Sequence, residues 1–275
     1  MRTILDTILE DVREEVSAAK LLRTAADIRA MVADAAPPRD FHAALASSFG
    51  LIAEIKERSP SVGPMREENV REAAGAYAES PIVRAVSVLT NQHHFGMDIG
   101  RLQAVRATVP QPVLRKDFLL DEYQVREARA FGADAILLMA NVLDAAQMRG
   151  FYDLARELGM EAIFEVHTAD EMGSIPAGAR IAGINSRKFQ SESGFVGGSG
   201  ASEKDFSIDL GVFGLAGNLP SGCLRVAESG ITPSTLGRVR EEFQAALVGT
   251  SLLRDPRGLR ACLREFEAAA LLRNG

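Results

Sequence analysis

The stretch LIAEIKERSPS, residues 51–61, is among the most informative in the chain because it joins an apolar run directly to a charged end. Residues 51–55 read as a buried strand, and Glu54 and Lys56 come where that strand finishes. Side chains two apart on a strand share a face, so Ile52, Glu54 and Lys56 point the same way. The stretch therefore predicts a charged pair at the rim of a core, unless this one strand simply runs out to solvent.

The same design recurs at the ends of five later apolar runs. Residues 112–118, PVLRKDF, carry Lys116 at the strand end, and residues 162–166, AIFEV, carry Glu165. The other three runs end on Asn185 with Arg187, on Glu228, and on the glycine-containing turn at 249–251. Polar groups gathered at the carboxyl ends of successive strands are typical of the active site of a (β/α)8 barrel. Six such ends in one chain predict a shared site.

Apolar strands alternate with longer helical patterns along most of the chain. Candidate strands begin near Leu51, Val83, Pro112, Asp134, Glu161, Arg180, Leu224 and Gln244. Helical patterns lie between them, for example at 122–131, 143–158 and 255–269. Eight strand–helix units favour parallel pairing through right-handed crossovers. No Gly-x-Gly-x-x-Gly follows the first strand, which argues against an open dinucleotide-binding sheet. The sequence therefore predicts an α/β protein with a (β/α)8 TIM barrel.

The first part of the chain precedes the eight strand–helix units. Residues 3–20 have the apolar spacing of an amphipathic helix, and a second helix is expected over 23–35. We interpret the chain as a single barrel domain over 1–275, in which residues 1–48 form an N-terminal helical extension over the catalytic face.

Bulk properties exclude several classes of protein. A net charge of −6 argues against a nucleic-acid partner. No apolar run approaches the roughly 18 residues of a membrane helix, and early acidic residues such as Asp6 and Glu10 argue against a secretory leader. A cytoplasmic location with no membrane contact is the expectation. The histidines are scattered, so no metal site is expected, and the adjacent His93 and His94 are not expected to converge on one ligand.

The charged strand ends suggest acid–base chemistry on an anionic substrate. If Lys56 and Lys116 both face the barrel mouth, they should lower each other's pKa, which suits a general acid. Glu54 and Glu165 would act as bases or hold the lysines, and the alternative is a set of ion pairs that only closes the barrel. The glycine turns at 228–230 and 249–251 leave backbone N–H groups open to a phosphate.

Several motifs together resemble the indole-3-glycerol phosphate synthase family. They are residues 51–61, SVLT at 87–90, PVLRKDF at 112–118, GADAILL at 132–138, EVH at 165–167, GINSR at 183–187 and ESGI at 228–231. The resemblance runs in order from about residue 4 to 266. It implies a (β/α)8 barrel that converts 1-(2-carboxyphenylamino)-1-deoxyribulose 5-phosphate to indole-3-glycerol phosphate, carbon dioxide and water. It implies a carboxy-lyase of tryptophan biosynthesis that needs no cofactor and no metal.

The resemblance also assigns residues. Lys116 would protonate the substrate carbonyl together with Glu165, and Lys56 with Glu54 would assist the loss of water. Asn185 and Glu228 complete the expected catalytic set, and Arg187 orients the substrate. The phosphate is expected at Ser59, Ser229, Gly230, Gly249 and Thr250, and the aromatic ring at Phe95, Phe118 and Leu137. The expected partner is this small phosphorylated substrate. The expected state is a monomer, with association with other tryptophan-pathway enzymes left open.

The chain departs from the family pattern at several positions. Asn91 stands where an acid is usual, Lys188 stands beside Arg187, and residues 79–81 and 95–98 also differ. Two alternatives therefore stay open: a diverged paralogue acting on a related arylamino-sugar phosphate, or a catalytically silent phosphate-binding barrel that serves as a partner protein. The Gly/Ser-rich segment 190–205 is expected to act as a lid, against the alternative of an inert insertion.

Overall fold

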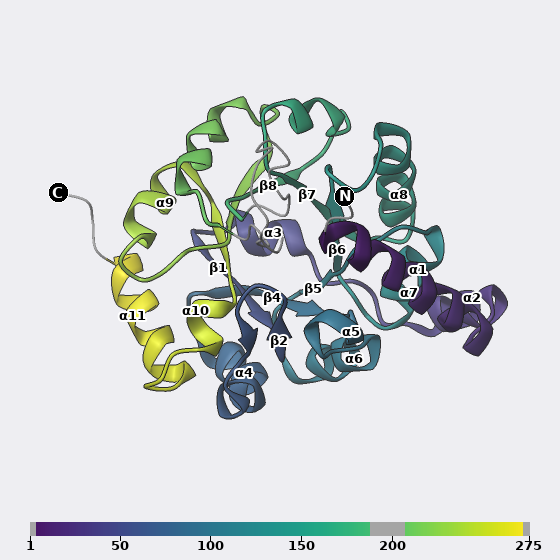
Figure 1. Ribbon diagram of the computed structural model, residues 1–275, viewed down its shortest axis with the longest axis horizontal. Coiled ribbons are helices and arrows are strands. Elements are labelled where there is room, and N and C mark those ends of the chain that lie inside the picture. Colours follow the sequence, from purple (N-terminus) through teal and green to yellow (C-terminus); the bar gives the residue numbers. More distant parts are fainter. Residues whose placement is uncertain (1–3, 188–206, 272–275) are drawn as a thin grey trace, which may run out of the picture.

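The computed structural model describes residues 4–187 and 207–271, and within them eight parallel strands close into a barrel (Figure 1). Around the barrel the strands are β1 (Gly50–Ile55), β10 (Ala245–Val248), β9 (Leu224–Glu228), β8 (Ile181–Asn185), β7 (Glu161–Val166), β6 (Ala135–Met139), β5 (Val113–Lys116) and β4 (Val83–Leu89). All eight begin within one residue of the expected positions, and the predicted (β/α)8 barrel is confirmed. The segment 190–205, with the lid expected there, lies outside the described residues, as does Lys188.

Alternation along each strand explains how the barrel holds its core. On β1, Leu51, Ala53 and Ile55 pack outward against the surrounding helices, whereas Ile52 belongs to the cluster inside the barrel. Glu54 has the same parity as Ile52 and therefore also points inward. Lys116, Glu165, Asn185 and Glu228 follow the same rule on their own strands. Each comes two residues, or a multiple of two, after an inward-facing residue: Leu114, Ile163, Ile181 or Val226.

Helices cover the outside of the barrel, as Figure 1 shows. They are α4 (Glu67–Glu79), α6 (Ile99–Thr108), α7 (Glu122–Ala130), α8 (Ala145–Glu157), α9 (Leu236–Glu242) and α11 (Leu259–Leu271). Two four-residue helices, α5 (Gln92–Phe95) and α10 (Thr250–Leu253), follow the carboxyl ends of β4 and β10. The expected pattern differs after β7 and β8, where the described residues form the 3-10 helices η1 (Asp170–Ser174) and η2 (Leu210–Asn218). In η2, glycine recurs at 211, 214 and 217, and each glycine costs an α-helix about 1 kcal/mol relative to alanine.

Three helices precede the barrel, and they lie in different places. α1 (Ile4–Leu22) lies at the carboxyl ends of the strands, where Glu15 accepts a hydrogen bond from Asn91 in the segment that follows β4. α2 (Ala25–Asp34) packs along α7 at the outer wall (Figure 1). α3 (Phe41–Ala46) packs at the amino ends, where the Arg39 backbone donates to Asp134 just before β6. The treatment of 1–48 as one extension of a single domain stays a prediction.

A small antiparallel hairpin follows β1 at the catalytic end. It pairs β2 (Arg58–Ser59) with β3 (Gly63–Pro64) and carries Ser59 toward the barrel mouth. Among the described residues, no helix is long and apolar enough to cross a membrane.

Candidate active site

A cavity of about 420 Å³ opens at the carboxyl ends of the strands. Every residue assigned to the catalytic or substrate-binding site from the sequence lines it: Glu54, Lys56, Ser59, Phe95, Lys116, Phe118, Leu137, Glu165, Asn185, Arg187, Glu228, Ser229, Gly230, Gly249 and Thr250. These residues come from β1, β5, β6, β7, β8 and β9, from the short elements β2, α5 and α10, and from the loops beyond the strands. Barrel closure therefore joins positions that are far apart in the sequence into one site.

Two lysines contact three buried carboxylates: Lys116 contacts two of them, and Lys56 contacts the third. The Lys116 ammonium lies 3.3 Å from Oε2 of Glu165 and 3.7 Å from Oε2 of Glu228. Lys56 donates to Oε1 of Glu54, its neighbour along β1. All three carboxylates have side chains at most 5% exposed, so these are buried charges in need of partners.

The direction of the Lys116 pKa corrects the expectation drawn from the sequence. Burial by itself lowers the pKa of Lys116, as expected for a desolvated ammonium. The nearby carboxylates of Glu165, Glu228 and Glu54 more than offset that effect, so the pKa of Lys116 is raised. The pKa of Lys116 is therefore not lowered toward neutrality. Lys116 carries its proton throughout the physiological range.

Glu165 and Glu228 are a buried pair whose pKa values are pushed apart. Burial and the charge of Glu165 raise the pKa of Glu228 well above its ordinary value. Burial also acts to raise the pKa of Glu165, but Lys116 and His167 reverse that effect and leave its pKa lowered. One carboxyl therefore keeps its proton while the other is ionised. Such a divergence is a common mark of separate acid and base roles.

Replacing Glu228 with glutamine should stabilise the fold increasingly as pH rises. Below its ordinary value of 4.5, Glu228 is protonated in both the folded and the unfolded chain and contributes nothing to the pH dependence. Above that pH the unfolded chain ionises, whereas the folded chain retains the proton, so the wild type loses stability. A Glu228→Gln variant avoids this loss. Thermal unfolding between pH 5 and 8 should show a Tm difference that grows with pH in favour of the variant. A Tm that falls below wild type across this range would contradict the assignment.

Two glycines make room for the buried carboxylates. A Cβ added at Gly183 would overlap Oε1 of Glu228, and one added at Gly249 would overlap Oε1 of Glu54. Neither backbone has a positive φ, so close approach is the reason for glycine here. The glycine at 249 thus has a function besides the phosphate contact expected from the sequence, because it fixes the position of Glu54.

Replacing Gly249 with alanine should therefore lower kcat as well as raise KM. The added methyl group displaces Glu54 and its partner Lys56, and acid–base groups typically contribute about 100- to 10,000-fold. Gly75→Ala is the matched control, because a Cβ at Gly75 on α4 meets no atom within 4 Å. Steady-state kinetics on both variants separate the two effects. A Gly249→Ala enzyme with an altered KM and wild-type kcat would show that the glycine serves the anion alone.

One rim of the cavity, formed by the turn after β9 and by the β2–β3 hairpin, is rich in hydroxyl and backbone groups. Ser229 and Gly230 both have a φ of 69°, a left-handed turn that is strained for serine. The Ser186 hydroxyl donates to the Ser229 carbonyl at 3.0 Å and holds this turn. In the hairpin that follows β1, the hydroxyls of Ser59 and Ser61 are 2.8 Å apart. The rim thus offers neutral donors of the kind that bind phosphate oxygens.

The opposite wall of the cavity is apolar. Phe95, Phe118 and Leu137 lie there with Leu89 and Met139, and all belong to the inner cluster of the barrel. Ile8 and Val12 of α1 are buried in the same cluster. This wall suits a flat aromatic ring.

The sequence reasoning overlooked His167. Its Nε2 lies 3.6 Å from Oε1 of Glu165, and its Nδ1 lies 3.4 Å from Glu171, which also accepts from the His167 backbone. Burial lowers the pKa of His167, but the two carboxylates outweigh burial and leave it raised. His167 thus supports the ionised form of Glu165. The two-residue spacing from Glu165 was the signal that could have revealed it.

The structure also explains the departure at Asn91. This residue is fully buried, caps α5 by accepting from the His94 backbone at 2.8 Å, and donates to Glu15 at 3.0 Å. It does not line the cavity. An acid at this position would face the Glu15 carboxylate, and the two negative charges would repel each other.

Fold and site together define a (β/α)8-barrel enzyme with an acid–base centre between a polar rim and an apolar wall. A model of the family "Indole-3-glycerol phosphate synthase" matches residues 5–266. An indole-3-glycerol phosphate synthase of Nocardioides sp. is 41% identical over 92% of this chain and 94% of its own. The indole-3-glycerol phosphate synthase of Saccharopolyspora erythraea is 39% identical, over 91% of this chain and 90% of its own length. The chain belongs to the indole-3-glycerol phosphate synthase family.

Solved structures support the fold at lower similarity. A 3-hexulose-6-phosphate synthase superposes with a TM-score of 0.58 at 16% identity and covers 81% of this chain and 99% of that one. A phosphoribosyl anthranilate isomerase from Thermococcus kodakaraensis superposes with a TM-score of 0.52 at 12% identity. The match covers 82% of this chain and 100% of the isomerase. At these identities the likeness concerns the barrel alone.

Proposed function

We propose that this chain closes the indole ring of indole-3-glycerol phosphate, with loss of carbon dioxide and water from 1-(2-carboxyphenylamino)-1-deoxyribulose 5-phosphate. The observation that carries the proposal is the placement of Lys116 between Glu165 and Glu228 at the floor of the cavity. That cavity also has an apolar wall for the ring and a polar rim for the phosphate. Membership of the family supports the same reaction.

The first step forms a carbon–carbon bond. The ring carbon that bears the carboxylate attacks the ribulose carbonyl, and Lys116 donates a proton to the carbonyl oxygen as it gains charge. Its raised pKa supplies the protonated form that this role needs. Glu165, ionised and in contact with Lys116, orients the ammonium. Carbon dioxide then leaves, and its bonding electrons restore the aromatic ring.

The second step removes the hydroxyl that the first step created. Lys56 donates the proton with which this hydroxyl departs as water, and Glu54 accepts a proton from the substrate as the second ring becomes aromatic. Their direct hydrogen bond on β1 supports a paired action. Asn185 and Glu228, adjacent partners of β8 and β9, orient the intermediate between the two lysines.

The remaining cavity residues bind the substrate. Arg187 would pair with its carboxylate, and Phe95, Phe118 and Leu137 would flank its ring. The phosphate would lie against Ser59, Ser229, Gly230, Gly249 and Thr250, which line the rim. These assignments rest on the family resemblance and on the shared cavity.

Fluorescence provides the test, because the indole product emits where the substrate does not. Purified chain supplied with the carboxyphenylamino substrate should produce indole fluorescence that saturates with substrate concentration. An analogue without the phosphate should turn over with a much higher KM. No fluorescence with the natural substrate would support the silent barrel, and faster turnover of a ring-substituted analogue would support the paralogue.

We infer that the chain acts as a monomer in the cytoplasm. The two cysteines, Cys223 and Cys262, are free thiols. Reduced thiols fit a cytosolic compartment. Sedimentation at assay concentration tests the monomer: a dimer whose dissociation abolishes activity would refute it.

A further inference from the structure

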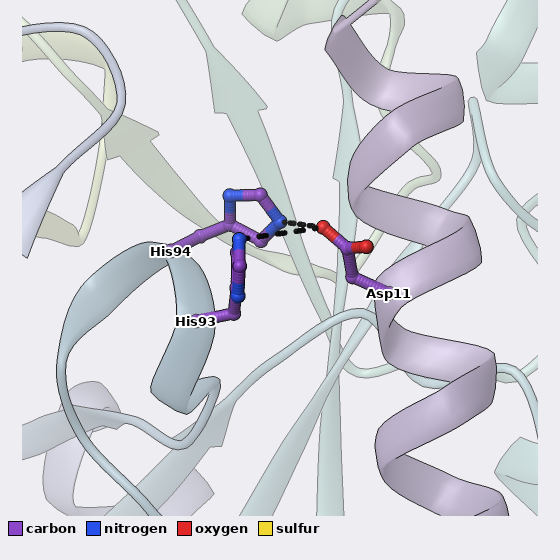
Figure 2. Close-up of side chains that lie close together, drawn as sticks. All are labelled: Asp11, His93 and His94. Carbon is purple, nitrogen blue, oxygen red and sulfur yellow. Dashed lines mark hydrogen bonds and ion pairs between the residues drawn. The ribbon is translucent and has the colours of Figure 1, made fainter.

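α1 and α5 meet around one carboxylate and two imidazoles, as Figure 2 shows. Oδ2 of Asp11 lies 2.8 Å from Nε2 of His94 and 3.8 Å from Nε2 of His93. The ligand atoms of the three residues all lie within 4.8 Å of one another. The two histidines, adjacent in sequence, therefore do converge on one group, contrary to the expectation from their spacing. None of the three residues lines the catalytic cavity.

These distances are close to those of a metal site. Ligand atoms at about 2.0–2.2 Å from a tetrahedral zinc ion lie about 3.3 Å apart. The two distances from Asp11 fall on either side of that value. The His93 side chain is 68% exposed, so its ring can turn toward the ion, whereas His94 is 10% exposed and held. Closing the site therefore requires the movement of one surface ring.

We propose that Asp11, His93 and His94 bind a divalent transition-metal ion of the zinc class and thereby tie α1 to α5. Two imidazoles and a carboxylate are a ligand set that suits zinc, and a water molecule completes four-coordination. In the bound form each ring presents the lone pair of Nε2 to the ion and carries its proton on Nδ1.

The surroundings of the three residues fit a bound cation. Glu15, one turn after Asp11, accepts from the His93 backbone at 3.2 Å and adds a second carboxylate beside the site. The same carboxylate accepts from Asn91, so the start of α5 is fixed relative to α1.

Metal binding here would link the N-terminal helix to a wall of the cavity. α5 ends with Phe95, which lines the cavity, and α1 buries Ile8 and Val12 in the cluster that contains this ring. An ion between Asp11 and the two histidines therefore restrains α1 over the site mouth. The proposal does not depend on which reaction the cavity performs.

The test is metal binding by the full chain after treatment with a chelator. Calorimetric titration with Zn²⁺ should show one ion per chain, and Co²⁺ should give the visible absorption of a tetrahedral site. Zn²⁺ should also raise Tm, since a ligand that binds the folded state stabilises it. Protease cleavage within α1 should become slower when Zn²⁺ is present.

His93→Ala is the decisive variant, because it removes one ligand and leaves the Asp11–His94 hydrogen bond intact. The contact of Glu15 is with the His93 backbone and also survives. The metal-free Tm should match wild type, whereas Zn²⁺ affinity should fall at least about tenfold, since even outer partners contribute that much. His42→Ala, which changes a histidine on α3 at the other end of the barrel, should bind as wild type does. Equal Zn²⁺ binding by wild type and His93→Ala, or no uptake by wild type at micromolar Zn²⁺, would overturn the proposal.

Discussion

Replacing Lys116 with methionine should lower kcat by about 100- to 10,000-fold, because the variant has no proton donor at the position of the substrate carbonyl. Methionine keeps the length of the side chain and its apolar stem. Its loss of charge has a second effect, since Glu165 and Glu228 no longer face an ammonium. The pKa of Glu165 should then rise, which adds to the loss of activity. Steady-state and single-turnover kinetics on the folded variant measure the combined loss.

An exposed lysine supplies the control for this substitution. Lys20 on α1 is 45% exposed and pairs with Asp121 on the surface, so Lys20→Met removes an ammonium without touching the cavity. It should keep wild-type kcat. If Lys116→Met retains more than half of the wild-type kcat while folding normally, the lysine is structural and the proposed acid lies elsewhere.

Replacing Glu165 with glutamine should have an effect of similar size for a different reason. Glu165 is fully buried and ionised, and it contacts both Lys116 and His167. The amide keeps the shape but removes the charge that orients the ammonium and holds its pKa raised. We therefore expect a loss of about 100-fold or more in kcat, with a smaller change in KM.

The same strand provides the matched control. Glu161 also lies on β7, but at its amino end, where it pairs with Arg156 and Arg180. Glu161→Gln makes the identical chemical change about four residues from Glu165 and outside the cavity, so kcat per folded molecule should stay near wild type. Equal kinetic losses in the two variants would mean that β7 responds to any change in charge, and the specific role of Glu165 would be refuted.

The strands and the catalytic end of the barrel were predictable from the alternation of side chains along each strand, because this alternation depends on local sequence. The parity of Ile52, Glu54 and Lys56 is a property of one strand, and the same rule placed Lys116 and Glu165 inside. Barrel closure then follows from the count of strands. For this reason the charged residues at the strand ends were predictable before any distance was known, whereas the residues around the aromatic ring came from the family resemblance alone.

Charge relations across the barrel were not predictable in the same way. Lys116 and Glu228 are more than a hundred positions apart, and only the closed ring brings them to 3.7 Å. The sequence shows two lysines near one mouth, and from that alone a lowered pKa was expected. The structure places carboxylates closer to Lys116, and they reverse the direction. Long-range electrostatics of this kind depend on geometry that no single segment contains.

The approach of His93 and His94 to Asp11 on α1 was not predictable from the sequence for a related reason. The two histidines belong to a four-residue helix, and their partner Asp11 is about eighty residues earlier. Spacing within the motif therefore carried no information about the third group. The replacement of α-helices by η1 and η2 was also missed, although the repeated glycines of η2 were visible in the sequence.

Carbon dioxide release measured together with ring closure shows whether the chain decarboxylates its substrate as it forms the indole ring. The purified chain would be given substrate labelled in its ring carboxylate, and labelled carbon dioxide and indole fluorescence would be followed in one mixture. The proposed mechanism predicts one carbon dioxide for each indole formed, with both signals lost together in Lys116→Met. Ring closure without release of the label, or no formation of either product by the wild-type chain, would contradict the account.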